Sequence, residues 1–288
     1  MGRRPPVRRR SMLPIFLLFL GTIGVVGFGA MIAIDMVASM DDEAYYTSLT
    51  GSFVPRIDWD AYDEEDYEDD EFDGYEVFHI PVDLAQERTS RAARLGARAM
   101  FVDFNQVRQN VPGARAWIRI DGTILDYPVM QGADNEFYLT RRPDGVPSRR
   151  GSIFIDYRNA PDFTDHNTLI HGHRMRSGAM FGMLSNYSSQ SFYDRHLTVS
   201  IFTPQGDYEL VLFAGYAIDQ TVEGVPIRFR DVETFYSYIE HARRRSMFRS
   251  DVEVSFGDRL VTLATCEYTF SDGRGRLLIV GKLVEKDY

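Results

Sequence analysis

The sequence predicts a mainly-β protein: an eight-stranded β-barrel with flanking helices, preceded by one N-terminal transmembrane helix. Three observations predict this fold class. An uncharged apolar stretch lies near the N-terminus, about eight β-rich runs follow between residues 116 and 284, and helical periodicity appears before and late within those runs. Strands of this number, joined by turn-rich loops, favour a closed or nearly closed barrel.

The N-terminus is predicted to be a basic cytoplasmic segment followed by a membrane anchor. Residues 1–10 contain five arginines, and no charged residue occurs from Ser11 to Ile34. An uncharged apolar stretch of this length can span a bilayer as a helix. Because basic flanks stay in the cytoplasm, we predict a single-pass anchor at 11–36, with the rest of the chain extracellular. A cleaved signal peptide is the alternative, but its apolar region is usually only about 7–15 residues long.

Residues 37–80 are predicted to form an acidic extracellular linker. The chain has a formal net charge of −10, and residues 41–76 alone hold fifteen acidic residues against one arginine. Charge of one sign without apolar periodicity is typical of a solvated, self-repelling spacer. A calcium loop starting at Asp58 would need glycine where Asp63 stands, so the spacer is the better interpretation. No long basic run follows the linker, which argues against nucleic-acid binding.

The domain predicted for residues 81–288 opens with a helical pattern over Asp83–Asn110. Apolar residues recur there at helical spacing: Ala92, Leu95, Ala99 and Val102. The stretch AWIRIDGTILDYPVMQ then holds two β-rich runs around Asp121-Gly122, which is a strong hairpin signal. Six more strands are predicted: Gly151–Asp156, Thr168–His171, Leu197–Thr203, Tyr208–Ile218, Arg259–Thr265 and Leu277–Val284.

One late helix, Asp231–Phe248, interrupts the strands. Its apolar residues fall on one face: Val232, Phe235, Ile239 and Ala242. Asp231 is a suitable N-cap, because its side chain can accept hydrogen bonds from the first turn.

The chain contains a single cysteine, Cys266, in the segment TLATCEYTFSDGRGR. One cysteine cannot form an internal disulfide, which leaves a buried small hydrophobe, an intermolecular bridge or a reactive nucleophile. A nucleophilic cysteine needs a proton carrier, and histidine is the usual one near neutral pH. Of six histidines, His171 and His173 lie directly after a predicted strand, in TLIHGHRMRSGAMF. For either one alone, a surface or core imidazole is the alternative.

Acyl chemistry also needs groups that hold a developing oxyanion, such as backbone N–H groups and a fixed cation. Arg274 and Arg276 both follow Cys266 closely. Arg276 directly precedes the predicted strand LLIVGKLV, and a strand positions a guanidinium better than the glycine-flanked loop around Arg274 does. The residues therefore favour Arg276, and for both arginines a solvated turn position is the alternative.

At these residues the sequence resembles the sortases, the membrane-anchored cysteine transpeptidases of Gram-positive bacteria. TLATC, residues 262–266, is similar to the family signature T-L-x-T-C. HGHRM is similar to the family's histidine motif, in which the catalytic histidine follows a glycine, so the resemblance implies His173. His171 occupies a position often held by tyrosine in the family. Arg276, ten residues after Cys266, matches the family arginine.

A wider resemblance to class B sortases covers about residues 83–286. The segments WIRIDGTILDYPVMQGADNEFYL, GSIFID and SGAMFGML are similar to that class, as is the late helix at 231–248. In class B a helix lies in the long connection between the sixth and seventh strands of the barrel. The resemblance therefore implies a sortase-type barrel.

The resemblance implies a cysteine-type endopeptidase and transpeptidase that acts on the C-terminal sorting signal of secreted proteins, of the LPxTG or NPxTx kind. Cys266 would form a thioester, and His173 would protonate the departing amine. Arg276 and the backbone N–H of Glu267 would hold the oxyanion. An amine of a peptidoglycan precursor or a pilin lysine would then take the acyl group, without any metal or organic cofactor.

Other residues are expected to shape the substrate groove. Ala264 and Thr265 would flank it, and the 219–250 connection would form one wall. Asn135 and Tyr138 are further candidates, for which turn capping and core packing are the alternatives.

Two other function classes compete with this interpretation. An L,D-transpeptidase also pairs histidine with cysteine outside the cell, but it places its cysteine in an S-x-G-C-type motif whose glycine TLATC lacks. A non-catalytic surface adhesin or scaffold would keep the cysteine only as a spare core thiol.

Overall fold

The structure is a computed structural model that describes residues 13–53, 102, 104–267 and 274–286. The chain forms two compact units, Met1–Tyr46 and Thr47–Tyr288. The second unit carries the barrel and all the candidate site residues.

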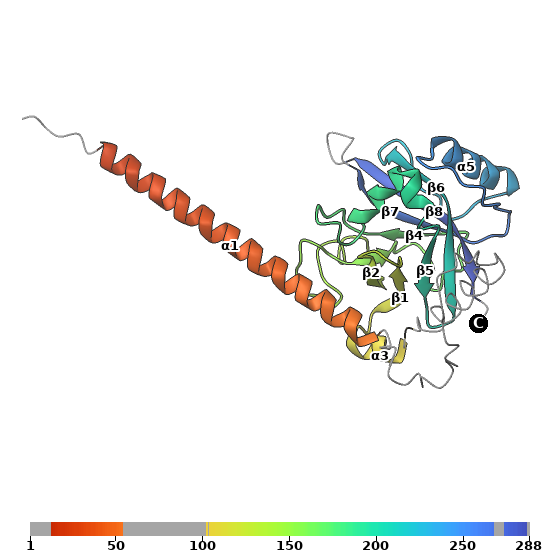
Figure 1. The fold of residues 1–288 in the computed structure, drawn as a ribbon, viewed down its shortest axis with the longest axis horizontal. Coiled ribbons are helices and arrows are strands. Elements are labelled where there is room, and N and C mark those ends of the chain that lie inside the picture. The colour runs from red at the N-terminus through yellow and green to blue at the C-terminus, as the bar shows by residue number, and fades with distance from the viewer. Residues whose placement is uncertain (1–12, 54–101, 103, 268–273, 287–288) are drawn as a thin grey trace, which may run out of the picture. The chain divides into compact units, whose positions relative to one another are not determined.

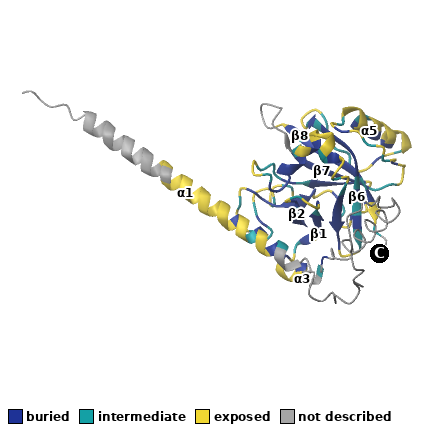
Figure 2. Ribbon diagram, in the orientation of Figure 1, coloured by how far each residue is buried: buried dark blue, intermediate teal, exposed yellow. Residues whose placement is uncertain are grey.

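The N-terminal unit is dominated by one helix, α1 (Leu13–Phe53). Figure 2 shows that most of its described side chains are exposed. In the described part of the chain, no helix is both long and apolar enough to cross a membrane. The anchor predicted for 11–36 begins in residues that lie outside the described ranges, and it stays a prediction.

The predicted linker differs from the structure at its start. Residues 37–53 are helical, because α1 continues to Phe53, whereas the sequence predicted a spacer from residue 37. The physical reason is the placement of the charge: residues 44–53 carry none, and the acidic residues concentrate at 58–76. Residues 54–80 lie outside the described ranges.

The C-terminal unit is a closed barrel of eight strands in the order β1-β2-β3-β4-β7-β8-β6-β5 (Figure 1). The eight strands confirm the predicted number and closure. Their bounds are β1 Ala114–Arg119, β2 Asp126–Met130, β3 Ile153–Ile155, β4 Asn167–His171, β5 Thr198–Phe202, β6 Asp207–Asp219, β7 Leu260–Glu267 and β8 Gly275–Glu285.

The predicted hairpin joins β1 to β2. The two strands pair antiparallel, with Arg119 opposite Asp126. Gly122 has a φ of 72°, a left-handed conformation that glycine adopts without steric cost. The Asp121-Gly122 signal therefore marks the observed turn.

Two neighbouring pairs in the barrel are parallel, β2 with β3 and β4 with β7. The pairing of β4 with β7 matters for the site, because parallel strands end at the same edge of a sheet. β8 pairs antiparallel with β7, so its first residues lie at that same edge. The structure therefore brings the end of β4, the end of β7 and the start of β8 together.

Short helices lie around the barrel. The helix predicted over Asp83–Asn110 is described only at its end, as α3 (Phe104–Asn110). The loop after β4 contains a 3₁₀ helix (Gly182–Ser188) and α4 (Gln190–Tyr193), which the sequence did not predict.

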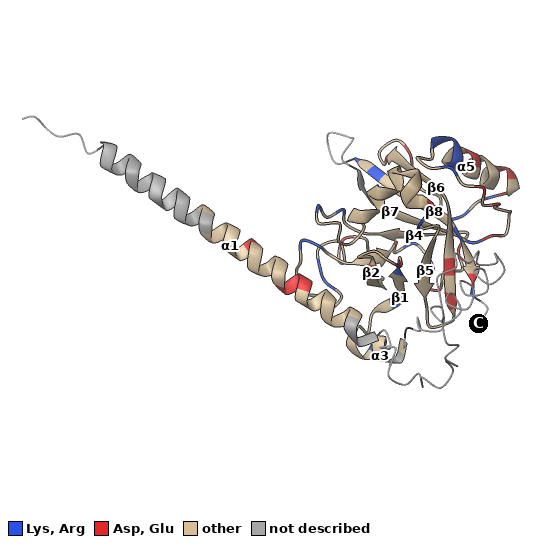
Figure 3. Ribbon diagram, in the orientation of Figure 1, with Lys and Arg blue, Asp and Glu red and all other residues tan. Residues whose placement is uncertain are grey.

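The late helix is α5 (Val232–Arg245), in the connection between β6 and β7. Asp231 caps it as predicted, accepting a hydrogen bond from the backbone N–H of Thr234 at 2.9 Å. Phe235 and Ile239 are buried, but Val232 is 48% exposed, which corrects the predicted apolar face. The reason is that Val232 is the first helical residue. Basic residues gather in the last turn (Figure 3), where they complement the helix dipole.

The apolar side of α5 packs against the outer face of the barrel. The shared cluster contains Phe235 and Ile239 from α5 and alternate residues of three strands: Ala214, Tyr216, Ile218, Leu260, Ala264, Leu278 and Val280. The connection between β6 and β7 therefore covers the same face of β7 and β8 on which positions 266 and 276 lie, since alternate strand positions share a face.

Candidate active site

The strongest feature of the site is the register between β7 and β8. Cys266 lies directly opposite Arg276 in this antiparallel pair, and Glu267 lies opposite Gly275. The loop that joins the two strands, 268–273, lies outside the described residues. The barrel thus places at neighbouring backbone positions two residues that are ten apart in the chain.

The histidine motif reaches the same edge through β4. His171 is the register partner of Ala264 on β7, and the backbone N–H of Gly172 donates to the carbonyl oxygen of Ala264 at 3.1 Å. His173 follows immediately, so the chain leaves β4 beside the end of β7. Cysteine, histidine and arginine therefore come from three neighbouring strands at one end of the barrel.

His173 is held by contacts on both its side chain and its backbone. Its Nε2 lies 2.6 Å from the carbonyl oxygen of Leu139, and since a carbonyl only accepts, Nε2 carries the hydrogen. In the neutral ring, Nδ1 is then the nitrogen with the lone pair. The backbone oxygen of His173 accepts from the N–H of Phe181 at 3.0 Å, which fixes the loop.

The two candidate arginines differ in their surroundings. Arg276 is half-buried and donates from Nη1 to the carbonyl oxygen of Gly275 at 2.8 Å. Arg274 is exposed, and its Nη1 lies 3.8 Å from Oδ2 of Asp219 on β6. The register position opposite Cys266 belongs to Arg276, as the sequence favoured.

A buried carboxylate lies beside the histidine motif. Asp156, at the end of β3, has a side chain that is only 1% exposed, and its Oδ2 lies 3.0 Å from Nε2 of His171. Arg158 donates to both carboxylate oxygens, at 2.8 and 2.9 Å, and Asn135 donates to Oδ2 at 2.9 Å. Burial raises the pKa of Asp156, but the hydrogen bonds from His171, Arg158 and Asn135 outweigh it and hold the pKa well below its ordinary value.

Known proteins are similar to this chain in sequence and in structure. The sortase domain family model matches residues 118–284, more than half of the chain. The chain belongs to the sortase family. Sortase B of Staphylococcus aureus is 32% identical over 188 residues, covering 65% of this chain and 76% of the relative. Sortase B of Listeria monocytogenes is 36% identical over 184 residues, covering 64% and 74%.

Solved structures agree with the sequence relatives. The structure described as a Staphylococcus aureus sortase B–substrate complex has a TM-score of 0.60 and 32% identity, covering 64% of this sortase and 85% of that chain. These matches confirm the predicted class B resemblance and the barrel. Family membership makes the chain a sortase transpeptidase.

The other predicted site residues fall in four environments of the sortase barrel. Ala264 and Thr265 are buried, with exposed fractions of 4% and 2%, and Glu267 ends β7. Asn135 holds the turn after β3, donating to Asp156 and accepting the N–H of Tyr157 at 3.0 Å. Half-buried Tyr138 packs edge-on against Phe137. The predicted roles of all five in substrate binding stay predictions.

A polar network that the sequence analysis missed ties β4 and β7 to the β6–β7 connection. Thr262 donates to Oδ1 of Asn167 at 3.0 Å, and Tyr238 of α5 lies 3.4 Å from the Thr262 hydroxyl. Asn167 also donates to the carbonyl oxygen of Pro226 at 2.9 Å. Thr262 is part of TLATC, so these hydrogen bonds join β7, the strand that carries Cys266, to the β6–β7 connection.

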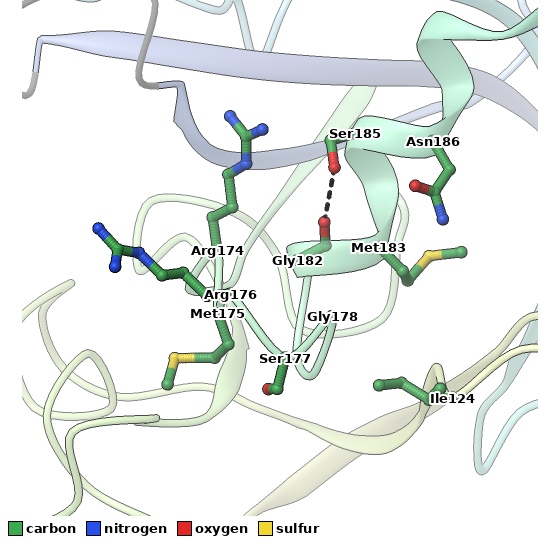
Figure 4. Close-up of a pocket in the computed structure, with 10 residues that line it drawn as sticks. All are labelled: Ile124, Arg174, Met175, Arg176, Ser177, Gly178, Gly182, Met183, Ser185 and Asn186. Carbon is green, nitrogen blue, oxygen red and sulfur yellow. Dashed lines mark hydrogen bonds between the residues drawn. The ribbon is translucent and has the colours of Figure 1, made fainter.

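A cavity of about 500 Å³ adjoins the loop that follows His173 (Figure 4). Ile124 and Met183 give it apolar walls, and Ser185 donates to the carbonyl oxygen of Gly182 at 2.9 Å. Arg174 and Arg176 also line the cavity, on the side opposite Ile124 and Met183 in Figure 4. Within the described residues, no group of three or more histidine, cysteine or acidic side chains is placed to hold a metal ion.

Proposed function

We propose that this sortase is a cysteine transpeptidase that cleaves a C-terminal sorting signal and transfers the new carboxyl end to an amine. The observation that supports this most is the register that sets Cys266 opposite Arg276, at the barrel end where His173 follows β4. This arrangement supplies a nucleophile, a proton carrier and a fixed cation within one small region.

The first half of the reaction forms a thioester. The Cys266 thiol passes its proton to His173, and the sulfur attacks the carbonyl carbon that follows the threonine of an LPxTG or NPxTx-like signal. Arg276 and the backbone N–H of Glu267 stabilise the negative oxygen of the tetrahedral intermediate. His173 gives a proton to the departing amine as the C–N bond breaks.

The second half transfers the acyl group. An amine of a peptidoglycan precursor or a pilin lysine attacks the thioester, and His173 removes a proton from that amine. The C–S bond then breaks and its electron pair returns to the sulfur of Cys266. The product is a new amide, and the thiolate is restored.

The proposal places the enzyme at the cell membrane. The uncharged stretch from Ser11 to Ile34 would anchor the chain, and the five arginines before it favour a cytoplasmic N-terminus. The catalytic domain would then meet secreted substrates outside the cell.

A panel of fluorogenic sorting peptides tests this function. The purified chain is incubated with each peptide, with and without an added amine, beside Cys266→Ala and His173→Ala. We expect cleavage of at least one peptide, ligation only when the amine is present, and no turnover in either variant. Turnover that survives in Cys266→Ala would contradict the proposal. So would failure of iodoacetamide to label the native chain, because a non-catalytic core thiol would be unreactive.

A further inference from the structure

His171 has one ring nitrogen fixed by a buried carboxylate. The distance from its Nε2 to Oδ2 of Asp156 is 3.0 Å. Asp156 also accepts the paired hydrogen bonds of Arg158, which only an ionised carboxylate satisfies well. An ionised carboxylate accepts and never donates, so Nε2 of His171 must carry the hydrogen.

The other nitrogen of this ring is left as an acceptor. In a neutral imidazole with hydrogen on Nε2, Nδ1 holds a lone pair. Among the described residues, no hydrogen bond is made to Nδ1 of His171. A quarter of the side chain is exposed, so the acceptor is not sealed within the core.

The backbone position of His171 lies close to that of Cys266. His171 is the register partner of Ala264, and position 266 lies two residues further along the same face of β7. With strands about 4.8 Å apart and a rise of about 3.3 Å per residue, the Cα atoms of His171 and Cys266 are roughly 8 Å apart. That separation leaves room for a substrate group between them.

The two flanks of Cys266 differ chemically. On the β8 flank lies Arg276, which would hold the oxyanion. On the β4 flank lie His171 and His173. An amine that gives its proton to His173 must approach on the β4 flank, where His171 is the neighbouring side chain.

We propose that Nδ1 of His171 accepts an N–H hydrogen bond from the primary amine that attacks the thioester, and so orients that amine toward the carbonyl carbon. This inference rests on the proposed function, and it names the residue that binds the amine, the second substrate of the transpeptidase. One N–H of the amine bonds to His171, a second gives its proton to His173, and the nitrogen lone pair faces the thioester. Asp156 is a positioning residue, because it fixes the ring nitrogen that carries hydrogen.

Two substitutions separate amine binding from a purely structural role. The ammonium group of His171→Lys can still donate to Asp156, but it has no acceptor. His171→Phe removes both functions. The matched control is His196→Phe: His196 lies between α4 and β5, packs on Phe192 and bonds to its carbonyl oxygen.

The experiment measures initial rates of ligation with triglycine as the amine, and separately the hydrolysis of the sorting peptide without amine. We expect both His171 variants to raise the KM for triglycine by roughly 2- to 12-fold, the effect of losing one hydrogen bond, and to change the KM for the peptide less. We expect His196→Phe to match the wild type.

Three results are informative in different ways. Wild-type KM values for triglycine in His171→Lys, with a defect only in His171→Phe, would show that His171 serves only to bond Asp156 and would overturn the inference. A rise confined to the KM for the peptide would also overturn it, because His171 would then bind the sorting signal. Absence of any thioester in the wild type would instead contradict the proposed function itself.

Discussion

Replacing Gly172 by alanine tests whether close packing beneath the histidine loop positions His173. Gly172 lies between the two histidines of the motif, at the end of β4. A Cβ atom there would lie 2.7 Å from Cδ2 and 2.8 Å from Cγ of Phe181, well inside van der Waals contact. Phe181 is fully buried, so its ring has no exposed space into which to move.

The cost of the substitution follows from this overlap. Overpacking a filled core costs about 1–3 kcal/mol of unfolding free energy. The N–H of Phe181 also donates to the carbonyl oxygen of His173 at 3.0 Å, so a displaced Phe181 moves His173. Since a misplacement of about 1 Å can cost roughly a hundredfold in rate, ligation should fall by more than the stability loss alone explains.

Urea unfolding and peptide ligation measure the two effects of Gly172→Ala. Gly224→Ala is the control, because a Cβ atom there has nothing within 4 Å. Adding Phe181→Leu to Gly172→Ala should recover part of the lost stability, as expected for two residues in contact. Unfolding at the same urea concentration as Gly224→Ala, with normal ligation, would refute the packing argument.

Three further predictions concern other parts of the site. Arg276→Lys keeps the positive charge but loses the planar guanidinium, so the rate of ligation should fall by roughly a hundredfold or more. Arg274→Lys should ligate at nearly the wild-type rate. Equal rates in the two variants would count against the role of Arg276. The pKa of Asp156 in the folded state lies below its unfolded value of about 3.9, so the ionised side chain stabilises the fold above that pH and this stabilisation is lost as the pH falls. In urea titrations, Asp156→Asn should have a lower unfolding free energy than the wild type at pH 7, and the difference should shrink toward pH 3. A difference that does not change with pH would disprove the assignment. Thr262→Val removes a buried hydroxyl that joins β7 to Tyr238, and should lower the unfolding free energy by about 1–3 kcal/mol; unchanged thermal and urea transitions would contradict the network.

Local signals in the sequence predicted most of the barrel. Asp121-Gly122 marked the first turn, Asp231 marked the start of α5, and every predicted strand corresponds to an observed one. Periodicity could not predict strand order, because the parallel pairing of β4 with β7 joins segments about 90 residues apart. Val232 was predicted to be buried, but it is the first residue of α5 and is exposed.

The site was predictable where a short motif carries the chemistry. Cys266 and Arg276 lie close in sequence, and the antiparallel pairing of β7 with β8 brings them into register. The link from Asp156 to His171 was missed, because the histidine was considered without its strand partner. The antiparallel register of β3 and β4 sets His171 opposite Phe154, two residues before Asp156 on the same face, and the sequence alone did not fix that register.

Intact-mass spectrometry of the purified chain after brief incubation with a cleavable sorting peptide tests the central claim most directly. We predict a mass increase equal to the acyl part of the peptide, located on Cys266, absent from Cys266→Ala and removed by added triglycine. An adduct that forms on Cys266→Ala, or peptide cleavage without any acyl intermediate on the wild-type chain, would contradict the claim.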